Sequence, residues 1–143
     1  MNQGVQRVNE LAQELAEHRE GILPELALTT FFPRYWMREE EAEARFFEPS
    51  MPGLSTQPLF DLAKSLGIGF YLGYAERTAD GQRFHTSILV DEQAKIVGRY
   101  RKIHLPGHSD HKPEAPCQYL EKKFFEVGND GFGVWPMLGT NVG

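Results

Sequence analysis

The sequence lacks the features that mark secreted and membrane proteins. It has one cysteine in 143 residues, so no disulfide can form within the chain. No apolar run approaches the roughly 18–20 residues that a membrane-spanning helix needs. Residues 1–4 are polar and lead into charged residues, unlike the apolar core of a signal peptide. We therefore expect a cytoplasmic protein with no membrane contact.

An excess of positive charge is also missing. The 15 Lys and Arg residues are outnumbered by 20 Asp and Glu residues, which gives a net charge of -5. Proteins that bind nucleic acid usually carry a basic patch or stripe, so we expect no nucleic-acid partner. With 41% hydrophobic and 24% charged residues, the chain has the composition of one globular domain over residues 1–143.

The spacing of apolar residues changes along the chain from helical to strand-like. A period near 3.6 predicts helices over residues 4–19 and 38–47, and a third helix that Ser55 caps and Gly67 ends. The predicted strands cover residues 22–23, 68–74, 84–90, 95–101 and 132–135. A turn over residues 79–82 joins two of them, because Asp-Gly suits a tight hairpin. This order of elements predicts an α/β fold.

Three charged residues at the ends of predicted strands and loops could carry chemistry. Glu25 follows a short strand and lies among apolar residues, where burial would raise its pKa toward that of a general base. Lys102 closes a strand, where an ammonium could stabilise an oxyanion. Glu121 follows the long loop over residues 103–120. Each also has a plainer interpretation as a solvated surface charge, since Glu and Lys are mostly exposed.

The loop holds the other reactive side chains. His104, His108 and His111 invite a metal site, but Pro106 and Gly107 interrupt the helix that would align the first pair, so we expect no metal. We expect His104 instead to hydrogen-bond in the core beside Lys102. Cys117 has no strand-to-helix turn or neighbouring base to activate it, and we interpret it as non-catalytic.

Together these segments resemble the N-carbamoyl-D-amino-acid amidohydrolases of the nitrilase superfamily, from about Glu10 onward. The Tyr-Arg-Lys-x-His-Leu motif at residues 100–105 is typical of the superfamily, and Leu-Thr-Thr-Phe-Phe-Pro-Arg at 28–34 is typical of the carbamoylase branch. Further matching segments are residues 24–27, 66–70, 72–76, 86–91, 95–98, 106–108, 120–122 and 125–126.

The resemblance implies an α-β-β-α sandwich and a Glu-Lys-Cys mechanism with no cofactor or metal. It implies that Glu25 is the general base, that Lys102 stabilises the oxyanion, and that Glu121 positions the lysine and substrate. His104 and Tyr119 would border the substrate, an N-carbamoyl amino acid. Tyr119 departs from the family, whose close carbamoylases have a histidine there. The family also implies a homo-oligomer.

The resemblance also predicts an incomplete domain. The family's nucleophilic cysteine would lie beyond the segment that matches residues 134–143, and its first strand would precede the opening helix. We therefore expect a partial sandwich that is inactive alone, because the loss of one member of a catalytic unit removes most of its advantage. Two alternatives are a non-catalytic module that pairs with intact homologues, and a related amidase or nitrilase specificity.

Overall fold

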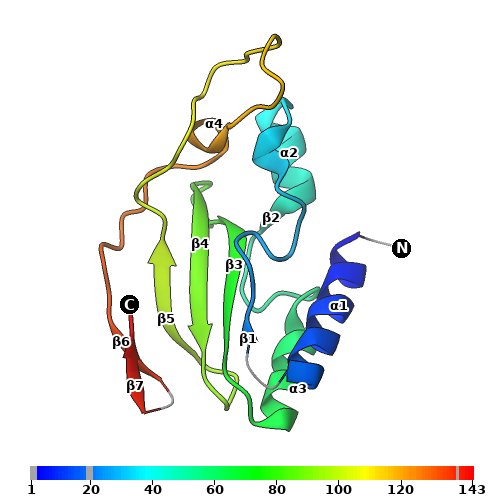
Figure 1. Ribbon diagram of the computed structural model, residues 1–143, viewed down its shortest axis with the longest axis vertical. Coiled ribbons are helices and arrows are strands. Elements are labelled where there is room, and N and C mark those ends of the chain that lie inside the picture. The colour runs from blue at the N-terminus through cyan, green and yellow to red at the C-terminus, as the bar shows by residue number, and fades with distance from the viewer. Residues whose placement is uncertain (1–2, 19–20, 138) are drawn as a thin grey trace.

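The computed structural model describes residues 3–18, 21–137 and 139–143. Its main sheet contains β1 (Gly21–Ile22), β2 (Phe47–Glu48), β3 (Phe70–Arg77), β4 (Arg83–Val90) and β5 (Ile96–Arg101). The first two strands both run parallel to β3, along its beginning and its end. On the other side, β3, β4 and β5 form an antiparallel meander (Figure 1).

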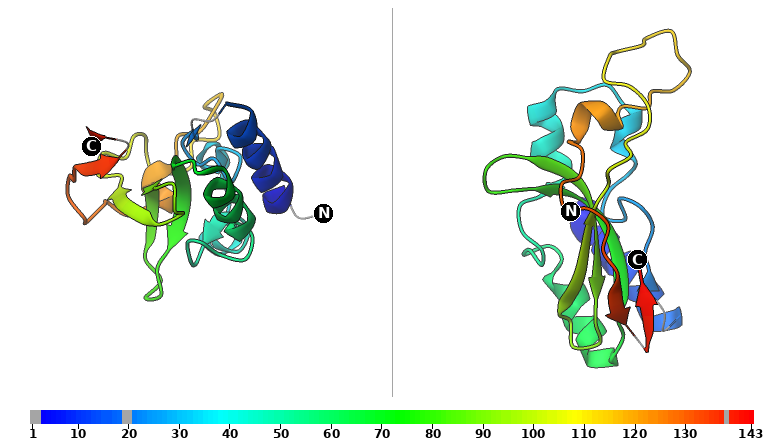
Figure 2. Two further views of the ribbon diagram at one scale, coloured as in Figure 1. Left: turned by 90° about the horizontal axis from the view of Figure 1, so that it is seen from below. Right: turned by 90° about the vertical axis from the view of Figure 1, so that its left-hand side faces the viewer.

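Helices α1 (Gln3–His18) and α3 (Gln57–Leu66) cover one side of the main sheet. They lie side by side next to β3 in both views (Figures 1 and 2). Leu11 and Leu15 of α1 and Phe60 of α3 are at most 2% exposed and share a core cluster with Phe70 and Leu72 of β3. Because alternate residues of a strand point to one face, this core covers one face of the sheet.

A second core lies near the opposite end of the sheet, under α2 (Glu39–Phe46) and α4 (Glu121–Phe124) (Figure 1). It is built around Phe32, which is fully buried and begins a short 3-10 helix (Phe32–Arg34). The Phe32 ring stacks on Phe46 at 4.6 Å and meets Phe124 and Phe125 at 5.5 and 5.7 Å. This aromatic packing holds α4, and with it the first residue of that helix, against the sheet.

The predicted elements are found with small shifts. The first helix spans Gln3–His18, and Arg19 of the prediction lies outside the described residues. Gly67 ends the third helix as predicted, with a left-handed φ of 64°. Ser55 is not its cap: the helix starts after Thr56, and the Ser55 hydroxyl donates to the Glu48 carboxylate instead. The competing carboxylate explains the wrong prediction.

The last predicted strand is displaced toward the C-terminus. Residues 132–134 are not in a strand, and Phe132 and Val134 are 77% and 69% exposed. Strand β6 (Trp135–Met137) pairs instead with β7 (Thr140–Val142). The partner strand decides where pairing begins, which the apolar pattern of one strand does not reveal.

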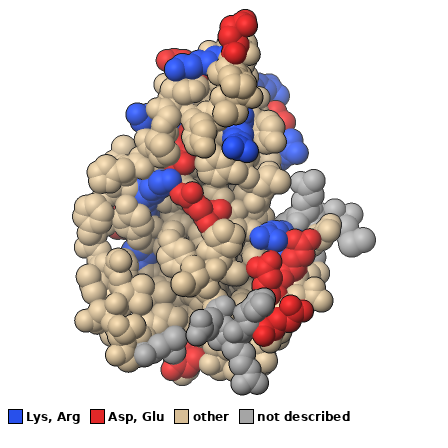
Figure 3. Space-filling view, in the orientation of Figure 1, with Lys and Arg blue, Asp and Glu red and all other residues tan. Residues whose placement is uncertain are grey.

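Charged side chains lie on the surface of α1. In Figure 3, acidic groups and a basic group lie over α1, where Arg7 pairs with Glu10 at 2.9 Å. In the parts of the chain that the structure describes, no helix combines the length and apolar character needed to cross a bilayer.

Candidate active site

Three predicted site residues meet at one end of the sheet. The Lys102 Nζ lies 2.6 Å from Glu25 Oε1 and 3.0 Å from Glu121 Oε2. Glu25 follows β1, Lys102 follows β5, and Glu121 is the first residue of α4. Residues separated by 77 positions therefore come into contact through the sheet. Glu121 is therefore not a solvated surface charge, and Glu25, although half exposed, is paired with Lys102.

The main chain on both sides of Glu25 is fixed to β3. The Leu23 N–H donates to the Tyr71 carbonyl at 3.0 Å, and the Ala27 N–H donates to the Gly73 carbonyl at 2.9 Å. A Cβ on Gly73 would lie only 3.1 Å from the main chain at Pro24 and Leu26, so glycine permits this close approach.

Leu26 adopts an uncommon conformation directly after Glu25. Its φ is 51°, in the left-handed region, and the residue is only 1% exposed. Such a conformation costs a non-glycine residue roughly 1–2 kcal/mol. Burial of the leucine in the second core offsets this strain. The turn therefore holds the Glu25 carboxylate in a fixed direction.

The two glutamates differ in their exposure. Glu121 is buried, with a side chain that is 2% exposed, whereas the Glu25 side chain is 53% exposed. Of the two alternatives for Glu25, a buried carboxylate and an exposed one, the structure has the exposed one, and it is Leu23 and Leu26 on either side that point into the cores. Pro24 and Glu25 are both exposed, so the carboxylate lies on the outer side of the turn.

The ion pairs determine the charge states of Lys102 and Glu121. Burial alone would lower the pKa of Lys102, but hydrogen bonds to Glu25 and Glu121 outweigh it and raise that pKa. Burial alone would raise the pKa of Glu121, but the neighbouring His85 and Lys102 outweigh it and lower that pKa. Lys102 therefore stays an ammonium and Glu121 a carboxylate at neutral pH.

One further residue of this cluster was missed from the sequence. His85 on β4 is 2% exposed, and its ring nitrogens lie 3.6 Å from Glu25 Oε1 and 3.5 Å from Glu121 Oε2. The sequence contains a signal for it: Thr86 pairs with Arg101 in the β4–β5 register, so His85 stands opposite Lys102. Working out the register of the predicted hairpin would have found this residue.

The predicted substrate-binding residues lie outside the cluster. His104 is exposed, and its ring stacks with Phe132 at a centroid distance of 6.5 Å, so the expected core hydrogen bond beside Lys102 is wrong. The chain leaves the strand after Arg101, and strand alternation no longer directs His104 inward. Tyr119 is 44% exposed and lies near Phe31, with ring centroids 6.4 Å apart. Cys117 is exposed on the loop.

A metal would have to compete with Lys102. Within the described ranges, the group of metal-type donors that lie within 4.8 Å of one another is Glu25, His85 and Glu121. The Lys102 ammonium already contacts both carboxylates and supplies the positive charge there. The loop histidines take other partners: His108 Nδ1 lies 2.7 Å from the Asp110 carbonyl, and His111 stacks on Trp36.

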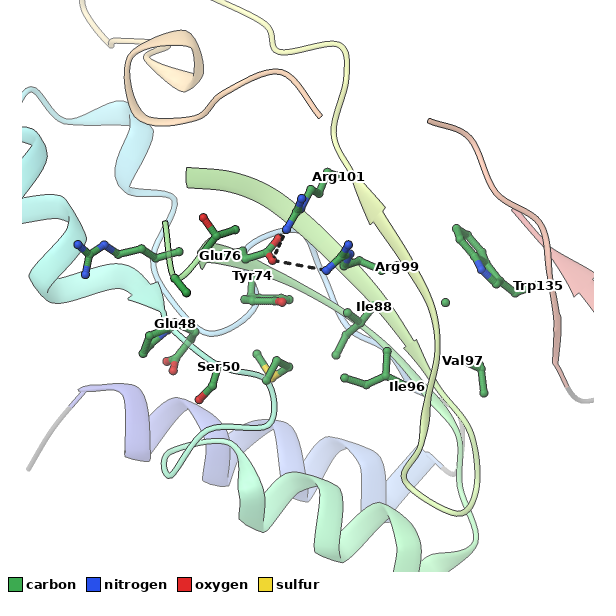
Figure 4. Close-up of a pocket in the computed structure, with 16 residues that line it drawn as sticks. Glu48, Ser50, Tyr74, Glu76, Ile88, Ile96, Val97, Arg99, Arg101 and Trp135 are labelled. Atoms are coloured by element: carbon green, nitrogen blue, oxygen red, sulfur yellow. Dashed lines mark hydrogen bonds and ion pairs between the residues drawn. The ribbon is translucent and has the colours of Figure 1, made fainter. Parts of the chain in front are cut away.

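A cavity lies elsewhere on the sheet. It has a volume of about 610 Å³ and is lined by Tyr74, Glu76, Arg99, Arg101 and Trp135, among others (Figure 4). Glu76 accepts two hydrogen bonds from Arg101 there, at 2.7 and 2.8 Å. Successive residues along a strand point to opposite faces of the sheet. Arg101 lines the cavity, whereas the next residue, Lys102, belongs to the cluster, so the cavity and the cluster lie on opposite faces.

The cluster combines an accessible base with a fixed cation. The half-exposed carboxylate of Glu25 can accept a proton from a group that approaches from solvent. The Lys102 ammonium has three N–H groups, so one remains beyond its two carboxylate contacts and can stabilise an oxyanion that develops beside it. This pairing suits acyl transfer to a nucleophile that the cluster itself does not contain.

Comparisons with known proteins identify the family of the chain. The family model described as Carbon-nitrogen hydrolase matches residues 2–143. A nitrilase from Pyrococcus abyssi is 34% identical over 122 residues, which cover 85% of this chain and 40% of the relative. A citrullinase from Francisella tularensis is 28% identical over 123 residues, which cover 82% of this chain and 39% of the relative.

A solved structure has the same fold. A carbon-nitrogen hydrolase from Helicobacter pylori G27 matches with a TM-score of 0.67 and 20% identity, over 93% of this chain and 42% of that one. At this identity the likeness concerns the fold, and it confirms the predicted α/β class. The chain thus spans about two fifths of the length of the relatives that it matches.

Proposed function

Because the chain belongs to the carbon–nitrogen hydrolase family, we propose that it supplies Glu25, Lys102 and Glu121 to an active site that hydrolyses N-carbamoyl-D-amino acids. The observation that supports this most directly is the position of the Lys102 Nζ, at 2.6 Å from Glu25 and 3.0 Å from Glu121. A hydrolase of this kind needs a base and an oxyanion-stabilising cation side by side, and these contacts provide both.

In the proposed mechanism a cysteine of the whole protein, outside these residues, is the nucleophile. Glu25 accepts the thiol proton, and the sulfur forms a bond to the carbamoyl carbon while Lys102 stabilises the oxyanion. The carbon–nitrogen bond then breaks, and Glu25 returns the proton to the leaving amino group. Glu25 then takes a proton from water, whose oxygen forms a bond to the carbamoyl carbon; the carbon–sulfur bond breaks, and Glu25 returns the proton to the leaving cysteine sulfur. The products are the amino acid and carbamic acid, which decomposes to carbon dioxide and ammonia.

Two relatives bear on the choice of substrate. Citrulline, which gives the citrullinase its name, carries a ureido group, and an N-carbamoyl amino acid carries the same group on its amino nitrogen. This shared chemistry favours a ureido substrate. The nitrilase relative favours a second candidate, a nitrile or simple amide. Preference for a D-amino acid rests on the carbamoylase-like segment at residues 28–34.

A substrate panel tests this proposal. The whole protein that contains this chain would be incubated with N-carbamoyl-D-phenylalanine, its L enantiomer, citrulline, an aliphatic amide and a nitrile, and ammonia release would be measured. We expect the first substrate to have the highest kcat/KM. Hydrolysis of amides or nitriles alone would contradict the carbamoylase assignment and favour the second candidate. The 143-residue chain assayed alone should release no ammonia.

A further inference from the structure

His85 occupies a place in the cluster that its strand neighbours determine. Its carbonyl accepts the Lys102 N–H at 2.8 Å, so the two residues are coupled through the main chain. Across the sheet its partner is Ala75, whose small side chain leaves room for the ring. Phe125 packs on the imidazole with a centroid distance of 5.1 Å. These contacts hold the ring in one position and so fix the directions in which its two nitrogens point.

Each ring nitrogen faces a different carboxylate. Nε2 lies 3.6 Å from Glu25 Oε1, and Nδ1 lies 3.5 Å from Glu121 Oε2. In the described part of the chain, the buried His85 Nδ1 has no hydrogen-bond partner, and it faces Glu121 Oε2, which also contacts the Lys102 ammonium at 3.0 Å. Buried polar atoms are usually hydrogen-bonded. A shift of a few tenths of an ångström would bring both pairs within hydrogen-bond distance.

Whether the ring can donate to both carboxylates depends on its charge. A neutral imidazole has one N–H and could donate to one carboxylate only, whereas an imidazolium donates from both nitrogens. The ionisable groups around the ring are Glu25 after β1, Glu121 on α4, and Lys102 after β5, which contacts the same carboxylates. Two carboxylates and one ammonium leave one negative charge unbalanced, and an imidazolium balances it.

We propose that His85 is a positioning residue that acts as an imidazolium and donates one N–H to each carboxylate, which fixes Glu25 and Glu121 around Lys102. This inference rests on the proposed function for its catalytic consequence, but the charge state of the ring is a property of the chain itself. When Glu25 accepts a proton during the reaction, the contact between His85 and Glu121 keeps Lys102 in place.

Nuclear magnetic resonance of the 143-residue chain tests the charge of the ring. With ¹⁵N-labelled histidine, we expect both nitrogens of His85 to be protonated at pH 7. A neutral ring with a single protonated nitrogen would overturn the proposal. This measurement uses the unsubstituted chain, so it does not depend on whether any variant folds.

Substitutions then test the effect on Glu121. His85→Phe keeps an aromatic ring against Phe125 but removes both donors, and His85→Asn keeps one donor. Because the neighbouring imidazole contributes to the lowered pKa of Glu121, we expect His85→Phe to raise the Glu121 titration midpoint. His85→Asn should have a smaller effect. The control is His111→Gln, at an exposed histidine stacked on Trp36. Equal midpoints in His85→Phe and the control would contradict the proposal.

Activity separates this inference from the proposed function. In the whole protein we expect His85→Phe to lower kcat about 100-fold, as small misplacements of catalytic groups do, with little change in KM and partial recovery in His85→Asn. Wild-type kcat in both variants would overturn the inference while the proposed function stands. If the unsubstituted protein hydrolyses none of the panel, the proposed function fails. The NMR measurement of the His85 ring still tests the inference in that case.

Discussion

Replacement of Lys102 by methionine would remove the charge at the centre of the cluster. Methionine is similar in length to the apolar stem of lysine, so the change mainly deletes the ammonium that lies 3.0 Å from Glu121 Oε2. The Glu121 side chain, only 2% exposed, would lose its nearest cation, whereas Glu25 at 53% exposure would remain solvated. The energetic effect should therefore come from Glu121.

Breaking a fully buried ion pair costs roughly 3–5 kcal/mol. Because the Lys102 side chain is 23% exposed and solvent screens part of the interaction, we expect Lys102→Met to lower the free energy of unfolding by about 2 kcal/mol at pH 7.

The effect should depend on pH in a defined direction. The pKa of Glu121 is below its ordinary value of 4.5, so its contribution is present above that pH and is lost as pH falls through the lowered pKa. The pKa of Lys102 is above its ordinary value of 10.5, so its contribution is present below that pH and is lost as pH rises through the raised pKa. The difference between variant and wild type should shrink at both extremes.

Urea unfolding followed by tryptophan fluorescence would measure these differences. The matched control is Lys122→Met, because Lys122 is an exposed lysine on α4, next to Glu121. It should change the free energy of unfolding by no more than about 0.5 kcal/mol. Equal stability of Lys102→Met and the control across the pH range would refute the assignment of Lys102 as the counter-ion of Glu121.

Two further substitutions test how the fold supports the site. Gly73→Ala would place a Cβ 3.1 Å from the main chain around Glu25. We expect it to lower the free energy of unfolding, measured in urea, by about 1–3 kcal/mol. Wild-type stability would show that the main chain does not approach Gly73 this closely. Phe32→Ala would empty the centre of the aromatic core under α4, and we expect a loss of about 3–5 kcal/mol. Phe132→Ala, at a residue 77% exposed, is its control, and equal losses in both would contradict the description of this core.

The helices and central strands could be predicted because their signals are local. The apolar spacing of α1 and the Gly67 stop involve neighbours within a few turns, and these features are found in the structure. The misplaced features depend on distant partners. Ser55 binds Glu48 rather than capping α3, and β6 starts where its pairing with β7 starts.

The same distinction applies to the site. The resemblance identified Glu25, Lys102 and Glu121, which the structure brings together, but the burial of each depends on tertiary packing. His85 was missed because its neighbours in sequence are unremarkable, and its role appears only when β4 and β5 are aligned. His104 was misplaced because it follows the end of β5 at Arg101, in a loop whose path depends on tertiary packing.

The most direct test of the account is ammonia release from N-carbamoyl-D-phenylalanine by the whole protein with Glu25→Gln. Glutamine keeps the size of the side chain but removes the base, so we predict that kcat falls by about 100-fold to 10,000-fold. Since Glu25 is half exposed, the free energy of unfolding should change by no more than about 0.5 kcal/mol. Wild-type turnover in this variant would contradict the claim that Glu25 and Lys102 form the catalytic pair.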